Sequence, residues 1–417
     1  MNQKSPWLKL DNAGKIFPAT SGKRETGVFR FSCEFKEPVQ ETALQAALDK
    51  TLLRFPHFLY ILRSGLFWYY LEPSDLHPQC HVENTGVCSQ LFYRNKRHLL
   101  LDVSYYHNRI QLETFHALAD GTGVMQFFQY LVCSYLAQIH PNEVSAELAD
   151  QAFPSSSFSS TEDSFQKYYH KVKQDKSKQP RRAYQLAGMR TEYQQVTEGL
   201  LPCDAVLRLA KSYHTTLTIF LCALLTLAIH QEMLLYKEKK PIVITVPVNL
   251  RQYFSSDTLR NFFGIIRVTY RFGHGNDTLE DIISSYQAAF SQELTKERLS
   301  GIISKYMSIE RNPLAKIVPL ALKNFVLRLA RRFSDSGETM VVSNVGKFDL
   351  PRELLPYLHH MSVFASTTKM QACICTCGNT LSVGFSSGLE ETEIQRNFFR
   401  LLAELGIEVE IQSNRME

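Results

Sequence analysis

A predicted strand that runs directly into a predicted helix is the feature that most restricts how this chain can fold. Residues 108–115 alternate between polar and apolar side chains, a pattern typical of a β-strand. Residues 123–137 place apolar side chains three and four positions apart, a pattern typical of a half-buried α-helix. The segment 114–121, Thr-Phe-His-Ala-Leu-Ala-Asp-Gly, connects them, so we expect its backbone to be held from both sides.

Two side chains in this segment, His116 and Asp120, are candidates for a chemical role. An imidazole exchanges protons near neutral pH because its ordinary pKa is about 6.5, so His116 is a candidate general base. Asp120 could hold the loop in place through a charged partner, and Gly121 could let a substrate chain pass close to the backbone. The alternative is structural: His116 is then an ordinary loop histidine, and Asp120 is the N-cap of the following helix.

Length and composition restrict the class of protein. The chain of 417 residues is longer than one typical domain, which suggests two or three structural units. A formal net charge of +5 is mild for this length; it permits an anionic ligand, and we expect no nucleic-acid partner. The nine cysteines are scattered without a Cys-x-x-Cys pair, and the first ten residues are too polar for a signal peptide. We therefore expect a cytoplasmic protein with free thiols.

Two segments bear on contact with a membrane. The longest apolar stretch, residues 217–229, has 13 residues, which is too short to span a bilayer and predicts a buried helix. Residues 313–333 form a basic amphipathic pattern that ends in Arg328-Leu-Ala-Arg331-Arg332. The favoured interpretation is a helix that packs on the core and exposes a cationic edge. Peripheral contact with an anionic membrane or a lipid acceptor is the alternative.

The remaining patterns predict helices mixed with strands in both halves of the chain. In the first half they predict a helix at 41–54 and strands at 28–35, 65–71 and 99–105. In the second half they predict helices at 204–213 and 217–229, strands at 241–248 and 264–270, a capping box at Thr278-Leu-Glu-Asp281 and a hairpin over 368–385. The fold class we expect is α/β with mixed sheets.

A polar, basic region lies between the two halves. Residues 154–163 are rich in Ser and turn formers, and residues 167–182 contain seven Lys or Arg and one acid, Asp175. We therefore predict a first lobe at 1–165, a linker at 166–185 and a second lobe at 186–417. The cations of the linker are either a solvated surface, which is the favoured interpretation, or a contact for ligand phosphates or an acidic carrier protein.

Three cysteines, Cys373, Cys375 and Cys377, alternate within the predicted hairpin, so a strand would place their thiols on one face. Three thiols could suggest a metal. However, thiols at i and i+2 without a second ligand cluster rarely form a tetrahedral site. We expect them to pack in the core or line a tunnel, and we predict no metal site.

The segment His116-Ala-Leu-Ala-Asp120-Gly121 resembles the His-x-x-x-Asp-Gly signature of the CoA-dependent acyltransferase superfamily. That superfamily includes chloramphenicol acetyltransferase, alcohol acetyltransferases, mycobacterial polyketide-associated acyltransferases and the condensation domains of peptide synthetases. Three further segments, Arg54–Phe58, Val246–Gly264 and Val342–Asp349, resemble motifs of condensation domains and follow in the same order. The resemblance covers about residues 40 to 390.

This resemblance implies two chloramphenicol-acetyltransferase-like lobes in a V, with a tunnel at their interface. It implies an acyltransferase that moves an acyl group from a thioester, acyl-CoA or an acyl-carrier phosphopantetheine, to an alcohol or amine. His116 would be the general base. We expect a small-molecule acceptor as partner, an acyl carrier protein as an alternative donor, and a monomer. A carrier-dependent condensation-like synthase and a catalytically silent binding module of the same fold are the alternatives.

The resemblance also implies roles for other residues. Asp120 would pair with an arginine, for which Arg54 is the first choice and Arg251 or Arg63 are alternatives. Ser343 and Asn344 are candidates for oxyanion stabilisation, and Asn249 for the tunnel wall; a simple turn explains Ser343 and Asn344 equally well. Condensation domains usually carry a second His where this chain has Phe115, which favours the alcohol-acetyltransferase side.

Overall fold

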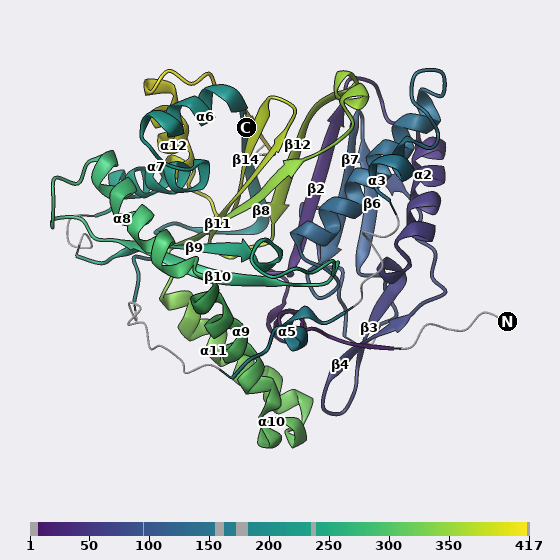
Figure 1. Cartoon of the computed structure of the whole chain (residues 1–417), viewed down its shortest axis with the longest axis horizontal. Helices are drawn as coiled ribbons and strands as arrows, with labels where there is room; N and C mark the ends of the chain where they lie inside the picture. Colours follow the sequence, from purple (N-terminus) through teal and green to yellow (C-terminus); the bar gives the residue numbers. More distant parts are fainter. Residues whose placement is uncertain (1–6, 95, 155–161, 172–181, 235–238, 415–417) are drawn as a thin grey trace.

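The computed structural model describes residues 7–94, 96–154, 162–171, 182–234 and 239–414, and it contains two large mixed sheets (Figure 1). The first sheet has five strands in the order β12-β2-β7-β6-β5, and the second has seven in the order β10-β9-β11-β13-β14-β8-β15. A third, three-stranded sheet has the order β1-β4-β3. The expected α/β class with mixed sheets is confirmed.

The first sheet is built mainly from the first half of the chain. Helices α2 and α3 pack against each other on one face of it (Figure 1). The alternating sequence of β2 explains this layer, because its apolar side chains and those of the helices form one buried cluster. The elements of this lobe are α1 (Ile16–Thr20), β2 (Val28–Phe35), α2 (Glu41–Arg54), β5 (His81–Val82), β6 (Leu101–Tyr106), β7 (Arg109–Phe115), α3 (Gly121–Ile139) and α4 (Leu148–Ala152).

The second sheet carries its helices on the face turned away from the first lobe (Figure 1). A separate buried cluster joins it to α6, α7, α8 and α12. The predicted capping box at Thr278 is confirmed, since the Thr278 hydroxyl and the Asp281 carboxylate each accept the other residue's backbone N–H. The elements are β8 (Arg190–Pro202), α6 (Cys203–Ser212), α7 (Leu217–Gln231), β9 (Ile242–Asn249), β10 (Phe263–Tyr270), α8 (Leu279–Glu293), β11 (Met340–Phe348), β13 (Met370–Cys377), β14 (Thr380–Leu389), α12 (Glu393–Glu404) and β15 (Glu410–Ser413).

One strand of the second half, β12 (Leu358–Ala365), joins the sheet of the first half as its edge strand, antiparallel to β2. It also packs against β13 and β14, so the two sheets are fastened through it. The predicted limits 1–165 and 186–417 therefore follow the order of the chain but not the boundary of the first sheet. The limit at 165 falls inside α5 (Ser164–Lys167), and residues 172–181 of the predicted linker lie outside the described residues.

Strand β13 lies between the two buried clusters, and this position explains why its cysteines are buried on one face. Cys373, Cys375 and Cys377 are buried in the cluster shared with the first lobe, whereas Ala372 and Ile374 point into the cluster of the second lobe. Alternation along the strand thus places all three thiols on one face, as predicted. Within the described residues, no group of His, Cys, Asp and Glu is arranged to hold a metal ion.

The remaining elements lie where the two lobes meet below the sheets (Figure 1). The predicted strand at 65–71 is correct only from Tyr69, where β4 begins; its first four residues form a turn after β3, closed by the bond from the Gly65 N–H to the Trp68 carbonyl. These elements are β1 (Leu8–Lys9), β3 (Tyr60–Ser64), β4 (Tyr69–Pro73), α9 (Lys296–Arg311), α10 (Pro313–Ile317), α11 (Leu320–Ser336) and the 3-10 turns η1 (Pro56–Leu59) and η4 (Leu250–Gln252). The 3-10 turn η5 (Arg352–Tyr357) lies elsewhere, directly before β12, where Tyr357 stacks on His140 at the C-terminal end of α3.

The single helix predicted over 313–333 is two helices. Pro319 lies directly before α11, where its fixed φ suits a helix start and its missing N–H cannot continue α10. In the part of the chain that is described, no single helix is long and apolar enough to cross a membrane. Helices α6 and α7 meet that criterion only as a pair that is bent by 83°.

The start of α3 lies against the loop before β10 so closely that only glycine fits at residue 123. A Cβ on Gly123 would lie 2.1 Å from the carbonyl oxygen of Leu259. We predict that Gly123→Ala lowers the free energy of unfolding by about 1–3 kcal/mol, because backbone must move to make room. Gly301→Ala in α9, where nothing lies within 4 Å, is the control. It should raise stability by about 0.5–1 kcal/mol. Urea titration measures both, and equal effects would contradict the packing argument.

Candidate active site

His116 lies directly after β7 and before α3, and both neighbours hold its backbone. The His116 N–H donates to the Gly27 carbonyl at 2.9 Å, and the Leu118 N–H donates to the Phe115 carbonyl at 2.9 Å. The side chains of Ala117 and Leu118 are buried in the first lobe. His116 itself is only half-buried, so the turn anchors its apolar residues in the core and leaves the imidazole at the edge.

The imidazole of His116 lies among aromatic rings from three parts of the chain. Phe17 of α1 stacks on it with ring centroids 4.3 Å apart and planes within 3° of parallel. Phe29 of β2 lies at 4.8 Å, and Phe263 of β10 lies at 5.7 Å. Burial among these rings lowers the pKa of His116, while the charge of Asp120 and a hydrogen bond with Asn261 oppose the shift. The ring is therefore neutral at neutral pH.

Asn261, in the loop between η4 and β10, fixes which nitrogen of the ring carries the proton. The Asn261 Nδ2 lies 3.0 Å from the His116 carbonyl oxygen, which can only accept, and 3.1 Å from the Asp11 carboxylate. The amide oxygen Oδ1 must then face His116 Nδ1, at 3.1 Å. Nδ1 therefore donates its proton to Asn261, and Nε2 carries the lone pair. Among the described residues Nε2 has no hydrogen-bond partner.

Asp120 acts as the N-cap of α3 and, through its other oxygen, as an anchor for the second lobe. Its Oδ1 accepts from the Gly123 N–H at 3.1 Å, so the structural interpretation of this residue holds. Its Oδ2 accepts from Arg251 Nη1 at 2.8 Å and from the Phe262 N–H at 2.9 Å. The carboxylate is buried, and its two oxygens thus join α3 to the loop that contains Asn261.

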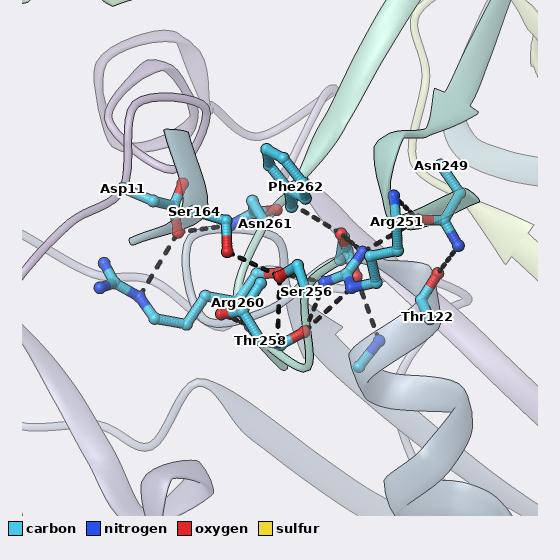
Figure 2. A network of polar contacts seen from close by, with 12 residues as sticks. Asp11, Thr122, Ser164, Asn249, Arg251, Ser256, Thr258, Arg260, Asn261 and Phe262 are labelled. Carbon is cyan, nitrogen blue, oxygen red and sulfur yellow. Dashed lines mark hydrogen bonds and ion pairs between the residues drawn. The ribbon is translucent and has the colours of Figure 1, made fainter. Parts of the chain in front are cut away.

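Arg251 organises that loop from within. Figure 2 shows its guanidinium among Asn249, Thr258 and Arg260: Nη1 reaches Asn249, and Nε and Nη2 donate to the Thr258 and Arg260 carbonyls at 2.6–2.9 Å. Asn249 in turn donates to the Thr122 hydroxyl of α3 at 3.2 Å. Arg251 therefore donates both to the loop and to Asp120. A lysine could not reproduce these bonds, because it lacks the planar fork of donors of a guanidinium.

The first choice of partner for Asp120 was wrong. Arg54, at the end of α2, donates to the Phe153 carbonyl at 2.8 Å, and Arg63 pairs with Glu72 at 2.9 Å. The alternative, Arg251, is the partner. The pair is also not bidentate, because the two oxygens of Asp120 face different groups. Asp120 instead accepts one bond from the guanidinium and two from backbone N–H groups.

Two residues beside His116 take positions that the sequence could not define. An added Cβ on Gly121 would touch only Val345 of β11, at 3.7 Å, so Gly121 faces the other lobe across an open contact. Phe115 points the opposite way, into the core of the first lobe, where it stacks with Phe92. The identity of residue 115 therefore bears on packing and carries no information about the acceptor.

The three candidates for an oxyanion or tunnel role lie on β9 and β11. Asn249 is bound to Thr122 and Arg251, and the Asn344 amide donates to the Thr218 hydroxyl at 2.9 Å and accepts from the Gly346 N–H. Ser343 is half-buried, next to a bulge in the pairing of β11 with β13. Their roles stay predictions; an oxyanion role for Asn344 would use the second N–H of its amide, since the first is bound to Thr218.

Two cavities are lined by residues that precede two neighbours of His116, Phe17 and Gly27, in the sequence. One of about 1080 Å³ lies between the β3–β4 turn and α9–α10 and is lined by aromatic rings and by cations that include Lys15, two residues before Phe17. Another of about 480 Å³ is lined by Lys23, Arg24 and Thr26, next to Gly27. Neither lining includes His116. The cations of both could hold an anionic ligand such as a phosphate.

Sequence reasoning assigned no role to Asn261, Asp11 or Phe17. Asn261 begins the segment Asn261-Phe-Phe-Gly264, which resembles a condensation-domain motif. That motif could have marked Asn261 as a candidate, but nothing in the sequence indicates its contact with His116. Asp11 lies 250 positions away and meets Asn261 only through the fold. Burial raises the pKa of the Asp11 carboxyl, and the charge of Arg260 opposes that shift.

Comparisons with solved structures identify the fold. TRI101 of Fusarium graminearum, complexed with coenzyme A and deoxynivalenol, superposes with a TM-score of 0.64 at 11% identity, covering 97% of this chain and 100% of that one. The first condensation domain of the calcium-dependent antibiotic synthetase gives 0.62 at 14%, covering 98% and 100%. Polyketide synthase associated protein 5 of Mycobacterium tuberculosis gives 0.61 at 15%, covering 95% and 98%.

The chain therefore has the two-lobed fold of CoA-dependent acyltransferases and condensation domains, and this prediction is confirmed. No family model matches the sequence, and comparison with curated proteins gives no match. At 10–15% identity, the comparisons extend to the fold and leave the reaction to be argued from the site.

The buried pair of Asp120 and Arg251 gives a direct stability test. We predict that Arg251→Met lowers the free energy of unfolding by about 3–5 kcal/mol, because it leaves the Asp120 charge buried without its partner. Arg63→Met, which breaks the exposed pair with Glu72, is the matched control and should cost about 1 kcal/mol or less. Chemical denaturation measures both. Equal losses would mean that Asp120 does not depend on Arg251.

Proposed function

We propose that the protein is an acyltransferase that moves an acyl group from a thioester, acyl-CoA or a carrier-bound phosphopantetheine, to an alcohol or amine acceptor. His116 is the general base. Asp120, Arg251 and Asn261 are positioning residues that hold the imidazole and its loop. Proteins of the same fold support this, since TRI3 of Fusarium sporotrichioides is a trichothecene 15-O-acetyltransferase and TRI101 is complexed with coenzyme A. The role of each residue rests on the geometry of this chain.

The orientation of the imidazole is the observation that carries the proposal. Nδ1 is bound to Asn261, so the basic lone pair lies on Nε2, which has no partner among the described residues. A packed structural histidine normally uses both nitrogens or buries them against apolar groups. Here one nitrogen is committed to holding the tautomer and the other is left available, which is the arrangement that general-base catalysis requires.

The reaction needs only one proton carrier. His116 Nε2 takes the proton of the acceptor hydroxyl or amine as its oxygen or nitrogen attacks the thioester carbonyl, and a tetrahedral intermediate forms. When the intermediate collapses, the carbon–sulfur bond breaks, and the imidazolium returns the proton to the leaving thiolate. The Nδ1–H bond to Asn261 persists through both steps and stabilises the imidazolium. Positioning of the two substrates supplies the rest of the acceleration.

The two cavities are the proposed entrances for the substrates. The larger is lined by aromatic rings and by cations close in sequence to Phe17, and the smaller by cations close in sequence to Gly27. Phe17 stacks on the imidazole and Gly27 accepts from the His116 N–H, so substrates that pass from each cavity along these residues would meet near His116. Movement of Phe17, which covers one face of the ring, would complete the path.

A free-thiol assay tests the proposal. The protein is incubated with acetyl-CoA and a panel of alcohols and amines, and released thiol is measured with a disulfide reagent. All nine cysteines are buried, so the native protein contributes little background. We predict that thiol release depends on an acceptor and falls about 10²–10⁴-fold in His116→Ala. His274→Ala, an exposed loop histidine, is the control and should retain full activity.

The outcome separates the three candidate functions. Acceptor-dependent release from acetyl-CoA supports the acyltransferase. Release only from an acyl group loaded on a carrier protein supports the condensation-like synthase. Release that is equal in His116→Ala, or absent with every donor and acceptor although the protein is folded, overturns the proposal in favour of a binding module.

Asn261 should affect the rate only by holding the His116 imidazole in place. We predict that Asn261→Ala lowers kcat on the order of 10²-fold, less than the loss of the imidazole itself, with little change in KM. The substitution releases Nδ1, so the ring can rotate and the proton can move to Nε2. A change confined to KM would contradict this role and would place Asn261 in substrate binding.

The lowered pKa of His116 predicts the pH dependence of the rate. Only the neutral imidazole accepts a proton, and burial shifts its pKa below the ordinary value of about 6.5. Activity should therefore stay constant as pH falls to about 6.5 and decline only below it. Because the Asn261 hydrogen bond opposes that shift, Asn261→Ala should move the decline to still lower pH. A profile of kcat/KM checks both, and a decline above pH 7 would contradict the assignment.

A further inference from the structure

Helix α11 exposes its apolar side chains to solvent. Leu322, Phe325, Val326, Leu329 and Phe333 are 45–71% exposed and lie within an arc of about 100° around the helix. We call these five residues the α11 stripe. Ile317, at the end of α10, is also exposed. Of the nineteen large hydrophobic side chains that are exposed in the described part of the chain, six lie between residues 317 and 333.

The opposite side of α11 is polar, and it faces the protein. Lys323 donates to the Phe67 carbonyl at 2.9 Å and lies over the Trp68 ring, while Asn324 donates to the Tyr69 hydroxyl at 2.8 Å. Further along, Arg328 donates to the Ala19 carbonyl at 2.8 Å, and Arg331 pairs with Glu25. Four polar side chains thus fasten α11 to the first lobe.

These contacts prevent the helix from burying its stripe. Rotation of α11 to turn the stripe inward would break all four contacts and leave the Glu25 carboxylate and three neutral acceptors of the first lobe without their donors, a cost that opposes the gain from apolar burial. The favoured sequence interpretation, a helix packed on the core with an exposed cationic edge, is therefore wrong: the polar face contacts the protein and the apolar face is exposed. An apolar patch of this size on a folded surface marks a binding surface.

We propose that the α11 stripe lies on the surface of a membrane that contains anionic phospholipid. The helix would lie in the plane of the bilayer, with Phe325 and Phe333 among the outer parts of the acyl chains. Such interfacial helices combine an apolar face with Lys and Arg that reach the headgroups. The stripe is convex and long, a shape that a fluid lipid phase accommodates without a matching groove.

Charge favours anionic lipid over a second copy of the chain. Residues 320–336 contain four cations and one acid, Asp335, which is paired with Arg331. Lys316 and Arg332 are exposed beside the stripe. Two copies packed stripe to stripe would bring these cations together, whereas headgroup phosphates would neutralise them.

The surface continues into the larger cavity. Leu66 and Phe67 in the β3–β4 turn are exposed, and the Leu66 carbonyl accepts from the Leu320 N–H at the start of α11. Leu66, Phe67 and Lys316 also line the cavity of about 1080 Å³. The start of α11 thus shares the β3–β4 turn with this cavity, so a bilayer on the stripe would lie near one wall of the cavity.

Vesicle co-sedimentation tests the proposal with the full chain. Vesicles of phosphatidylcholine alone are compared with vesicles that contain about 30 mol% phosphatidylglycerol. We expect binding to the anionic vesicles, and weaker binding when salt rises from about 0.1 to 0.5 M. The measurement needs no activity, so its failure and the failure of the proposed reaction can be told apart.

Paired variants locate the binding surface. Phe325→Gln with Phe333→Gln should lower the partition coefficient about tenfold or more, and Arg332→Gln should lower it two- to threefold. The controls are Leu53→Gln on α2 and Arg400→Gln on α12, which are exposed elsewhere and should leave binding unchanged. Because all of these side chains are exposed, circular dichroism should show the same fold for each.

Any one of four results would overturn the proposal. The first is no binding to anionic vesicles. The second is equal binding of the double Phe variant and the Leu53 control. The third is a concentration-dependent dimer in analytical ultracentrifugation that the double Phe variant abolishes, which would make a second copy the occupant. Capture of an acidic carrier protein by the stripe, in place of vesicles, would likewise reject the lipid surface.

Discussion

The buried carboxylate of Asp120 is the interaction on which the rest of the site depends. A carboxylate taken out of water is stable only with a cation and hydrogen-bond donors around it. Arg251 and the Phe262 N–H supply these from the second lobe, while the Gly123 N–H supplies one from the first. The alignment of the lobes at this point is therefore fixed by charge, because any slip between them would strip the carboxylate of its partners.

The state of His116 follows from that alignment. Its backbone belongs to the first lobe, but the amide that selects its tautomer, Asn261, lies in the loop that Arg251 shapes. The basicity of Nε2 is thus a property of the interface and not of either lobe alone. Phe17 and Phe263 approach the ring from the two halves and keep it neutral by excluding water. In the proposed reaction, this imidazole acts without a second catalytic side chain.

The helices and strands of the fold could be predicted from the sequence, whereas the contacts between elements far apart in the chain could not. Periodicity located β2 and α2 to the residue, and the motif around His116 located the junction, because both signals are local. The choice of Arg54 over Arg251 failed because pairing across the chain leaves no periodic trace. The edge strand β12 was missed for a related reason: its partner, β2, lies more than 300 positions earlier, and no local pattern records that pairing.

Helix α11 illustrates the same limit in another form. An amphipathic pattern indicates that a helix has a polar and an apolar face, and the usual prediction is that the apolar face is buried. Here Lys323, Asn324 and Arg331 find partners on the first lobe, and those contacts decide the orientation. The direction in which an amphipathic helix faces is set by whichever face finds complementary groups on its neighbour. A polar neighbour therefore leaves the apolar face to the surroundings, and the cations beside it select what those surroundings are.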